Sequence, residues 1–129
     1  MYGLVYYGNK NVRLENVPEP EPNENEVKIK IDLCGICATD IEEYEYGPKF
    51  ISFDTPHPLT QTKVPLIIGH EITGTIVSLG KNVINTKIGT KVVLDGTISC
   101  MECEQCISGK TTQCNFLGTI GFSKNGGLA

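Results

Sequence analysis

The 129-residue sequence contains no tryptophan, only two histidines and no long hydrophobic run. No apolar stretch approaches the ~20 residues that a helix needs to cross a bilayer, so we expect no membrane partner. The first residues also lack the basic region and apolar stretch of a secretory signal. A chain of this length fits one domain with an ordinary hydrophobic core, and the cytoplasm is its expected compartment.

Positive charge is scarce as well. Lys and Arg number 11 against 15 Asp and Glu, which gives a net charge of -4 and a pI of about 5.1. The chain has no cluster of basic residues, and a protein that binds nucleic acid needs one to neutralise phosphates. The sequence therefore argues against a nucleic-acid partner.

A dinucleotide-binding motif is also missing. No G-x-G-x-x-G follows a strand pattern and opens a helix anywhere in the chain. Residues 118–127 are rich in glycine, but no helical pattern follows them. The sequence therefore predicts no residues that bind NAD or NADP within this chain.

Cysteine, in contrast, is concentrated in one short segment. Four of the six cysteines form the pattern C-x2-C-x2-C-x7-C. Short spacers let tight turns aim neighbouring thiolates at one ion, and four thiolates complete the tetrahedral shell of a structural zinc. The alternatives are an iron–sulfur cluster and disulfides, but Asn115 stands where a ferredoxin motif usually has proline. We predict a structural zinc bound by Cys100, Cys103, Cys106 and Cys114.

The other two cysteines lie in Cys34-Gly-Ile-Cys37, and one of the two histidines lies in Gly69-His70-Glu71. Each signal is weak alone, because C-x2-C also occurs in redox pairs and a lone histidine is usually structural. Together they indicate a mixed zinc site with Cys37 and His70 as ligands and carboxylates nearby. A mixed site that keeps an open position is typical of catalytic zinc. Cys34 is the less promising thiol and is expected to be a small buried hydrophobe.

Two polar residues after Cys37 suit the same site. The hydroxyl of Thr39 is a candidate acceptor for a substrate proton, and the carboxylate of Asp40 is a candidate for orienting the imidazole of His70. These roles would complete a centre that polarises a bound alcohol.

Alternating apolar residues predict the clearest secondary structure. Val27, Ile29, Ile31 and Leu33 are separated by polar residues, so they are expected on the core face of one strand. Shorter patterns predict strands over 2–7, 11–17, 72–79 and 88–94. A short helix is expected over 40–46 behind a cap at Thr39 or Asp40, a helical turn near 104–108, and a proline-marked loop over 47–63. Many short strands and little helix indicate a mostly β fold, a small barrel or sandwich.

Taken in order, these motifs resemble the zinc-containing medium-chain alcohol dehydrogenases. The resemblance rests on Gly35–Asp40, Gly69–Gly74, Gly80 and the four-cysteine segment. It implies a GroES-like catalytic domain over residues 1–129, a partly open β-barrel with one or two short helices and a structural zinc lobe at 97–118. Residues 44–60 look most like the butanediol dehydrogenase branch, with sorbitol and threonine dehydrogenases as near relatives.

The same resemblance implies roles for individual residues. Cys37 and His70 match ligands of the catalytic zinc, Glu71 matches a carboxylate that can approach that zinc, and Thr39 matches the hydroxyl of a proton relay. The implied reaction is hydride transfer between NAD(P) and a secondary alcohol or diol, with the corresponding ketone as product. Glu42 stands where many relatives have a relay histidine, and His57 is a candidate substitute, although a loop histidine is the simpler interpretation.

Relatives also carry a Rossmann domain, which this sequence lacks. The resemblance therefore predicts a truncated catalytic domain that is inactive alone, uses NAD or NADP only as part of a longer parent, and forms a homo-oligomer. Two other functions remain open at this point. One is a zinc-stabilised binding module without chemistry, and the other is a thiol redox protein that uses Cys34 and Cys37.

Overall fold

A computed structural model describes all 129 residues as eight strands, two α-helices and one 3-10 turn. The bounds of the first four strands are β1 (Tyr2–Gly8), β2 (Asn11–Asn16), β3 (Val27–Gly35) and β4 (Leu66–Ile67). The remaining strands are β5 (Glu71–Leu79), β6 (Lys91–Val93), β7 (Thr97–Ile98) and β8 (Gly118–Thr119). The helical elements are α1 (Ala38–Tyr46), α2 (Glu104–Ile107) and the 3-10 turn η1 (Thr111–Gln113). Neither α-helix has the length and apolarity needed to span a membrane.

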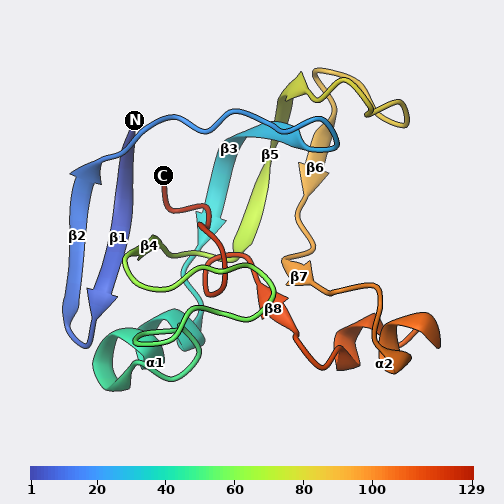
Figure 1. Cartoon of the computed structure of the whole chain (residues 1–129). Helices are drawn as coiled ribbons and strands as arrows, with labels where there is room; N and C mark the ends of the chain where they lie inside the picture. Colours follow the sequence, from blue (N-terminus) through green and yellow to red (C-terminus); the bar gives the residue numbers. More distant parts are fainter.

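The strands form three small antiparallel sheets, in the orders β2-β1-β4, β3-β5-β6 and β7-β8. Figure 1 shows the first two sheets on either side of the C-terminal segment, with α1 and the segment around α2 at one end. The C-terminal segment pairs with both β1 and the chain after β4. Leu4 N–H donates to Leu128 O at 2.7 Å, and Leu128 N–H donates to Ile68 O at 3.0 Å. The predicted mostly β, partly open barrel is confirmed.

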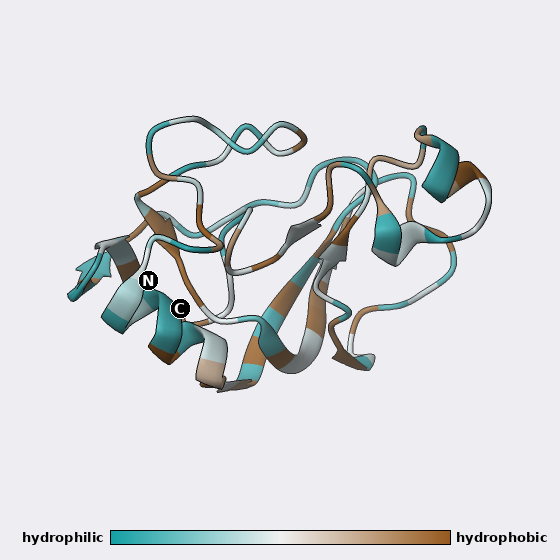
Figure 2. Ribbon diagram, turned by 90° about the horizontal axis from the view of Figure 1, so that it is seen from below, coloured by the Kyte–Doolittle hydropathy of each residue, from teal (hydrophilic) through white to brown (hydrophobic).

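The hydrophobic core lies where β1, β4 and the loop after α1 meet. Tyr6, Ile51, Leu66 and Ile68 form one buried cluster, and burying each aliphatic side chain stabilises the fold by about 1.5–3 kcal/mol. Ile72 and Ile76 of β5 are buried as well. Figure 2 shows the long paired strands banded brown and teal, the alternation expected of strands with one inward face.

The pairing of β3 with β5 corrects one expectation from the sequence. Leu33 was predicted on the core face, but its side chain is 73% exposed. Ile31 pairs with Gly74 and Leu33 pairs with Thr73, so Asp32 is an extra residue that breaks the register. Because a bulge reverses the alternation beyond it, Leu33 turns outward and Cys34 takes the inward position beside Ile72.

Helix α1 begins earlier than the sequence predicted. Cys37 is its N-cap residue, whereas the cap was expected at Thr39 or Asp40. The reason is that Asp40 occupies the third helical position, where its Oδ2 accepts the Cys37 N–H at 2.8 Å. A carboxylate there satisfies an otherwise unpaired amide and complements the helix dipole. Predicted strands at 2–7, 11–17 and 72–79 are confirmed within two residues, 88–94 shortens to β6, and 47–63 holds no strand or helix.

Glycines at the end of the chain serve close backbone packing. A Cβ atom at Gly121 would lie 2.6 Å from Gly69 O, and one at Gly126 would overlap the same oxygen. Gly69 and Gly121 also have positive φ angles of 98° and 88°, a region that residues with a Cβ rarely adopt. These contacts give the glycine-rich stretch 118–127 a structural role in the fold.

Candidate metal centres

Four thiols converge in the segment around α2. The Cys100 and Cys106 sulfurs are 3.9 Å apart and the Cys100 and Cys114 sulfurs 3.5 Å, and all four ligand atoms lie within 4.8 Å of one another. A tetrahedral ion with 2.3 Å bonds to sulfur needs sulfurs separated by ~3.8 Å. The donor set therefore fits a zinc ion with no position left for substrate.

Local turns place these thiols. The Cys103 N–H donates to Cys100 Sγ at 3.3 Å, and the N–H groups of Cys100 and Phe116 donate to Cys114 Sγ at 3.3 Å. Cys103 is also the N-cap of α2, so its two-residue spacer to Cys106 is one helical turn. Gly109, with φ of 81°, reverses the chain toward the last cysteine.

The thiols of this cluster ionise unequally. Backbone N–H groups at Asn115 and Cys106 lower the pKa of Cys103 to about 6. Burial raises the pKa of Cys106 to about 12, and the Cys100 N–H holds the pKa of Cys114 below its ordinary value. Backbone donors thus prepare part of the cluster as thiolates before a metal is present.

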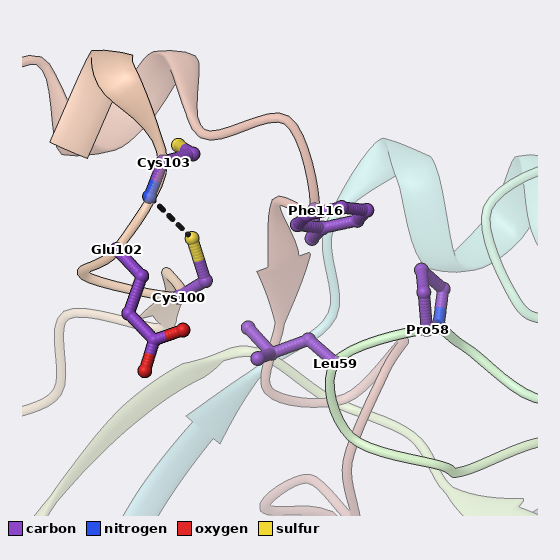
Figure 3. Close-up of a pocket in the computed structure, with 6 residues that line it drawn as sticks. All are labelled: Pro58, Leu59, Cys100, Glu102, Cys103 and Phe116. Atoms are coloured by element: carbon purple, nitrogen blue, oxygen red, sulfur yellow. Dashed lines mark hydrogen bonds between the residues drawn. The ribbon is translucent and has the colours of Figure 1, made fainter.

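The loop between α1 and β4 covers one side of the four-cysteine cluster. Pro58 and Leu59 of this loop line a cavity of ≈ 410 Å³ together with Cys100, Cys103 and two neighbours (Figure 3). His57 secures the loop, because its Nε2–H donates to Leu117 O at 3.1 Å while Nδ1 accepts the N–H groups of Leu59 and Thr60. Both ring nitrogens are therefore engaged with backbone, which favours the loop interpretation of His57 over a proton relay.

A second donor cluster forms where β3 ends and β5 begins. Gly35 pairs with Glu71 in the last register position of these strands, so Cys37 and His70 meet at the same end. The ligand atoms of Cys37, His70 and Glu71 all lie within 4.8 Å of one another. Gly35 makes room for this arrangement, because a Cβ there would overlap the Glu71 carboxylate.

Helix α1 places two polar groups around the His70 ring. Asp40 Oδ1 lies 3.5 Å from His70 Nδ1, and Thr39 Oγ1 lies 3.4 Å from His70 Nε2. Asp40 Oδ1 and His70 Nδ1 are buried and otherwise have no hydrogen-bond partner. A nearby carboxylate favours the proton on Nδ1, which leaves the Nε2 lone pair available to a metal.

Three other residues near this cluster are not among its metal-donor groups. Cys34 lies outside the donor set and is partly buried, less than the sequence predicted. Burial raises the pKa of its thiol, which opposes the redox role. Glu42 lies on α1 and pairs with Lys49 Nζ at 3.3 Å near the surface. Phe122, which no sequence motif indicated, lies with its ring 4.8 Å from the ring of His70.

Comparison with known proteins agrees with this architecture. Residues 23–129 match the family described as "Alcohol dehydrogenase GroES-like domain". The chain belongs to this family. It is 40% identical over 90 residues to (R,R)-butanediol dehydrogenase of Bacillus subtilis. The aligned region covers 70% of this chain and 26% of that protein. It is 38% identical over 113 residues to sorbitol dehydrogenase of Bombyx mori, covering 88% of this chain and 30% of that protein.

Solved structures show the same similarity in three dimensions. The crystal structure of 2R,3R-butanediol dehydrogenase from Bacillus subtilis superposes with a TM-score of 0.89 at 35% identity, covering 98% of this chain and 35% of that one. A zinc-binding dehydrogenase from Sinorhizobium meliloti, bound to NADP, gives a TM-score of 0.83 at 30% identity, covering 98% and 33%. The GroES-like domain thus spans about a third of these longer dehydrogenases.

Proposed function

We propose that this chain is the catalytic domain of a zinc-dependent alcohol dehydrogenase. The observation that carries the proposal is the convergence of Cys37, His70 and Glu71 within 4.8 Å, with Asp40 and Thr39 at the two nitrogens of one imidazole. A thiol, an imidazole and a carboxylate are a donor set typical of catalytic zinc. The separate set of four cysteines fits a structural zinc, which would hold residues 97–118 together.

The chain's own residues would prepare the site as follows. Zinc held by Cys37, His70 and Glu71 would supply a Lewis acid that lowers the pKa of an alcohol hydroxyl. Asp40 keeps the His70 ring in the required tautomer and orientation. Thr39 offers a hydroxyl that can accept a hydrogen bond from the substrate and pass a proton outward. Glu42 lies one turn further along α1, nearer to solvent, and we propose it as the next proton acceptor because His57 is held by the loop.

The proposed substrate is a secondary alcohol or diol, with its ketone as product. Support comes from the matched relatives, whose names include butanediol, sorbitol and D-arabinitol dehydrogenases. The proposed hydride acceptor is NAD or NADP, bound by a domain outside these 129 residues. The proposed compartment is the cytoplasm, where six thiols that serve as ligands or buried groups stay reduced.

Metal analysis of cysteine variants tests the proposal. The zinc-loaded chain should hold two zinc ions, and Cys37→Ser or His70→Ala should each remove one. Cys103→Ser should remove the other and disorder residues 97–118. Cys34→Ser is the matched control, because this thiol lies outside both donor sets, and it should keep both ions.

The experiment also distinguishes a catalytic domain from a zinc-stabilised binding module without chemistry. If Cys37→Ser and His70→Ala keep the zinc content of the unchanged chain, the chain is a zinc-stabilised module without a catalytic centre. The 129 residues alone should not reduce NAD(P) with 2,3-butanediol, because hydride transfer requires a nicotinamide held close to the reacting carbon. Zinc- and alcohol-dependent NAD(P) reduction by the isolated chain would contradict that expectation.

A further inference from the structure

Glu43 of α1 is a buried carboxylate that backbone amides satisfy in place of a cation. Only 1% of the residue is exposed. The N–H of Lys49 lies 3.1 and 3.0 Å from its two oxygens, that of Phe50 donates at 2.9 Å and that of Ile51 at 3.4 Å. None of the ion pairs in the chain includes Glu43. Consecutive N–H groups form an anion-binding nest, which offsets the several kcal/mol that burying a carboxylate costs.

The same face of α1 carries the groups around His70. Thr39 and Asp40 precede Glu43 by four and three positions, so all three side chains lie on one side of the helix. Thr39 and Asp40 approach the two nitrogens of His70. Glu43, one helical turn later, holds the loop that contains residues 49–51. The helix therefore fixes the imidazole and the loop as one unit.

That loop returns to the imidazole through two aromatic rings. The rings of Phe50 and Phe122 have centroids 5.7 Å apart, and those of Phe122 and His70 are 4.8 Å apart. The Phe50 N–H makes the shortest of the bonds to the Glu43 carboxylate. The position of the Phe50 backbone, and hence of its ring, therefore depends on the carboxylate.

Packing around Glu43 leaves it little freedom. The Tyr6 hydroxyl donates to the backbone carbonyl of Glu43 at 3.1 Å. A Cβ atom at Gly47 would overlap that carbonyl oxygen and lie 2.5 Å from the Tyr6 hydroxyl. Glu43 is thus held on its backbone side by Tyr6 and Gly47 while its side chain holds residues 49–51.

We propose that Glu43 is a positioning residue of the candidate catalytic centre. Its carboxylate holds Phe50 against Phe122 and so fixes the aromatic wall on which the His70 ring rests. The inference rests on the proposed function for the importance of His70, but the ring's position can be measured without a metal.

Histidine NMR tests the link directly, because the chain has only two histidines. Ring currents from Phe122 shift the carbon-bound imidazole protons of His70, and Phe122→Leu gives the signals of a ring without that neighbour. In Glu43→Gln, where an amide replaces one acceptor oxygen, the His70 signals should move toward the Phe122→Leu positions while those of His57 stay. Glu45→Gln is the matched control, since it makes the same change at an exposed carboxylate of α1, and it should leave the His70 signals in place.

Two outcomes would overturn the proposal. One is a Glu43→Gln protein with a lower unfolding midpoint but unmoved His70 signals, which would make Glu43 an anchor of the core alone. The other is unmoved His70 signals in Phe50→Ala, the variant to use if Glu43→Gln does not fold. Phe50→Ala changes a half-exposed ring at the far end of the same link, and unmoved His70 signals there would contradict the proposal.

A metal measurement then separates this inference from the proposed function. The zinc-loaded chain is stripped at the Cys37–His70 centre with a mild chelator and reloaded with Co²⁺, whose visible spectrum reports the site. Glu43→Gln should weaken Co²⁺ binding roughly 10-fold, and adding Phe50→Ala should weaken it no further. If the unchanged chain binds no Co²⁺ there, the proposed function fails, whereas the NMR comparison still decides the role of Glu43.

Discussion

Cys103 and Cys106 would bind the same zinc ion, yet folding shifts the pKa values of their thiols in opposite directions. Backbone N–H groups lower the pKa of Cys103 to about 6, and burial raises the pKa of Cys106 to about 12. Relative to an unfolded cysteine near 8.5, the folded state favours the thiolate of Cys103. That stabilisation is fully present above the unfolded pKa and is lost as pH falls through about 6.

Zinc binding to the metal-free lobe should therefore release more protons at pH 5 than at pH 7.5. Cys103 is already a thiolate at the higher pH and still a thiol at the lower one, whereas Cys106 gives up a proton at both. Calorimetry in buffers with different ionisation enthalpies measures the number of protons released. A number that does not change between these pH values would contradict the predicted ionisation of Cys103.

Among individual residues, the sequence predicted which donor side chains would converge better than it predicted their surroundings. The spacings of Cys100 to Cys114 and the motif Gly69-His70-Glu71 indicated which side chains would converge, because the chemistry of a ligand resides in the residue type. Phe122 and Glu43 carried no such mark. An aromatic residue near the end of the chain and one carboxylate in the run Glu42-Glu43 become informative only when distant segments meet.

Among the elements, the pairing of β3 with β5 decides where the second centre forms. Gly74 sits at the middle of this pair, opposite Ile31. A Cβ there would overlap the Lys30 carbonyl oxygen and lie 2.5 Å from the Cγ2 atom of Ile29. The absence of a side chain at this position is therefore a condition for the two strands to approach.

Gly74→Ala should lower the free energy of unfolding by about 1–3 kcal/mol, the usual cost of forcing an extra methyl group into a packed interior. It should also weaken Co²⁺ binding at Cys37 and His70, because the same strands bring these residues together. Gly96→Ala is the control, since its Cβ would meet Thr119 at an ordinary 3.5 Å. Chemical denaturation measures the unfolding free energies of both variants, and the visible spectrum measures Co²⁺ binding. Equal stabilities of Gly74→Ala and Gly96→Ala would contradict the prediction.

The predictability of elements follows from how local their signals are. Period-two alternation located β3 and β5, and the helical turn near residues 104–108 is confirmed as α2. The bulge at Asp32 could not be read from the sequence, because the apolar alternation continues through Leu33 without a break. The short pair β7 and β8 likewise depends on contacts between segments about twenty residues apart.

On the scale of the molecule, the sheets remain open at their edges. Strands β2, β3 and β6 each have one side without a partner strand. Leu33, Thr73 and Val93 form one row across β3, β5 and β6, and Leu33 and Val93 are 73% and 79% exposed. An exposed, partly apolar strand edge can pair with another chain.

The chain should therefore associate as its concentration rises, in line with the expected homo-oligomer. Val93→Lys should reduce this association, because a charge on the edge strand β6 disfavours pairing with a second copy. Sedimentation velocity over a concentration series measures the effect, with Ile84→Lys as a matched change at an exposed position outside the strands. A chain that stays monomeric at every concentration would contradict the prediction.

The contact among Gly69, Gly121 and Gly126 has a genetic consequence. Every amino acid that a glycine codon can reach by one base change carries a Cβ atom, and a Cβ at Gly121 or Gly126 would collide with the backbone of Gly69. No neighbouring side chain can move aside to relieve a clash between main chains. The codons of Gly121 and Gly126 therefore allow no single-base change away from glycine without a clash, and a library of random single-base variants selected for folding should return both residues unchanged.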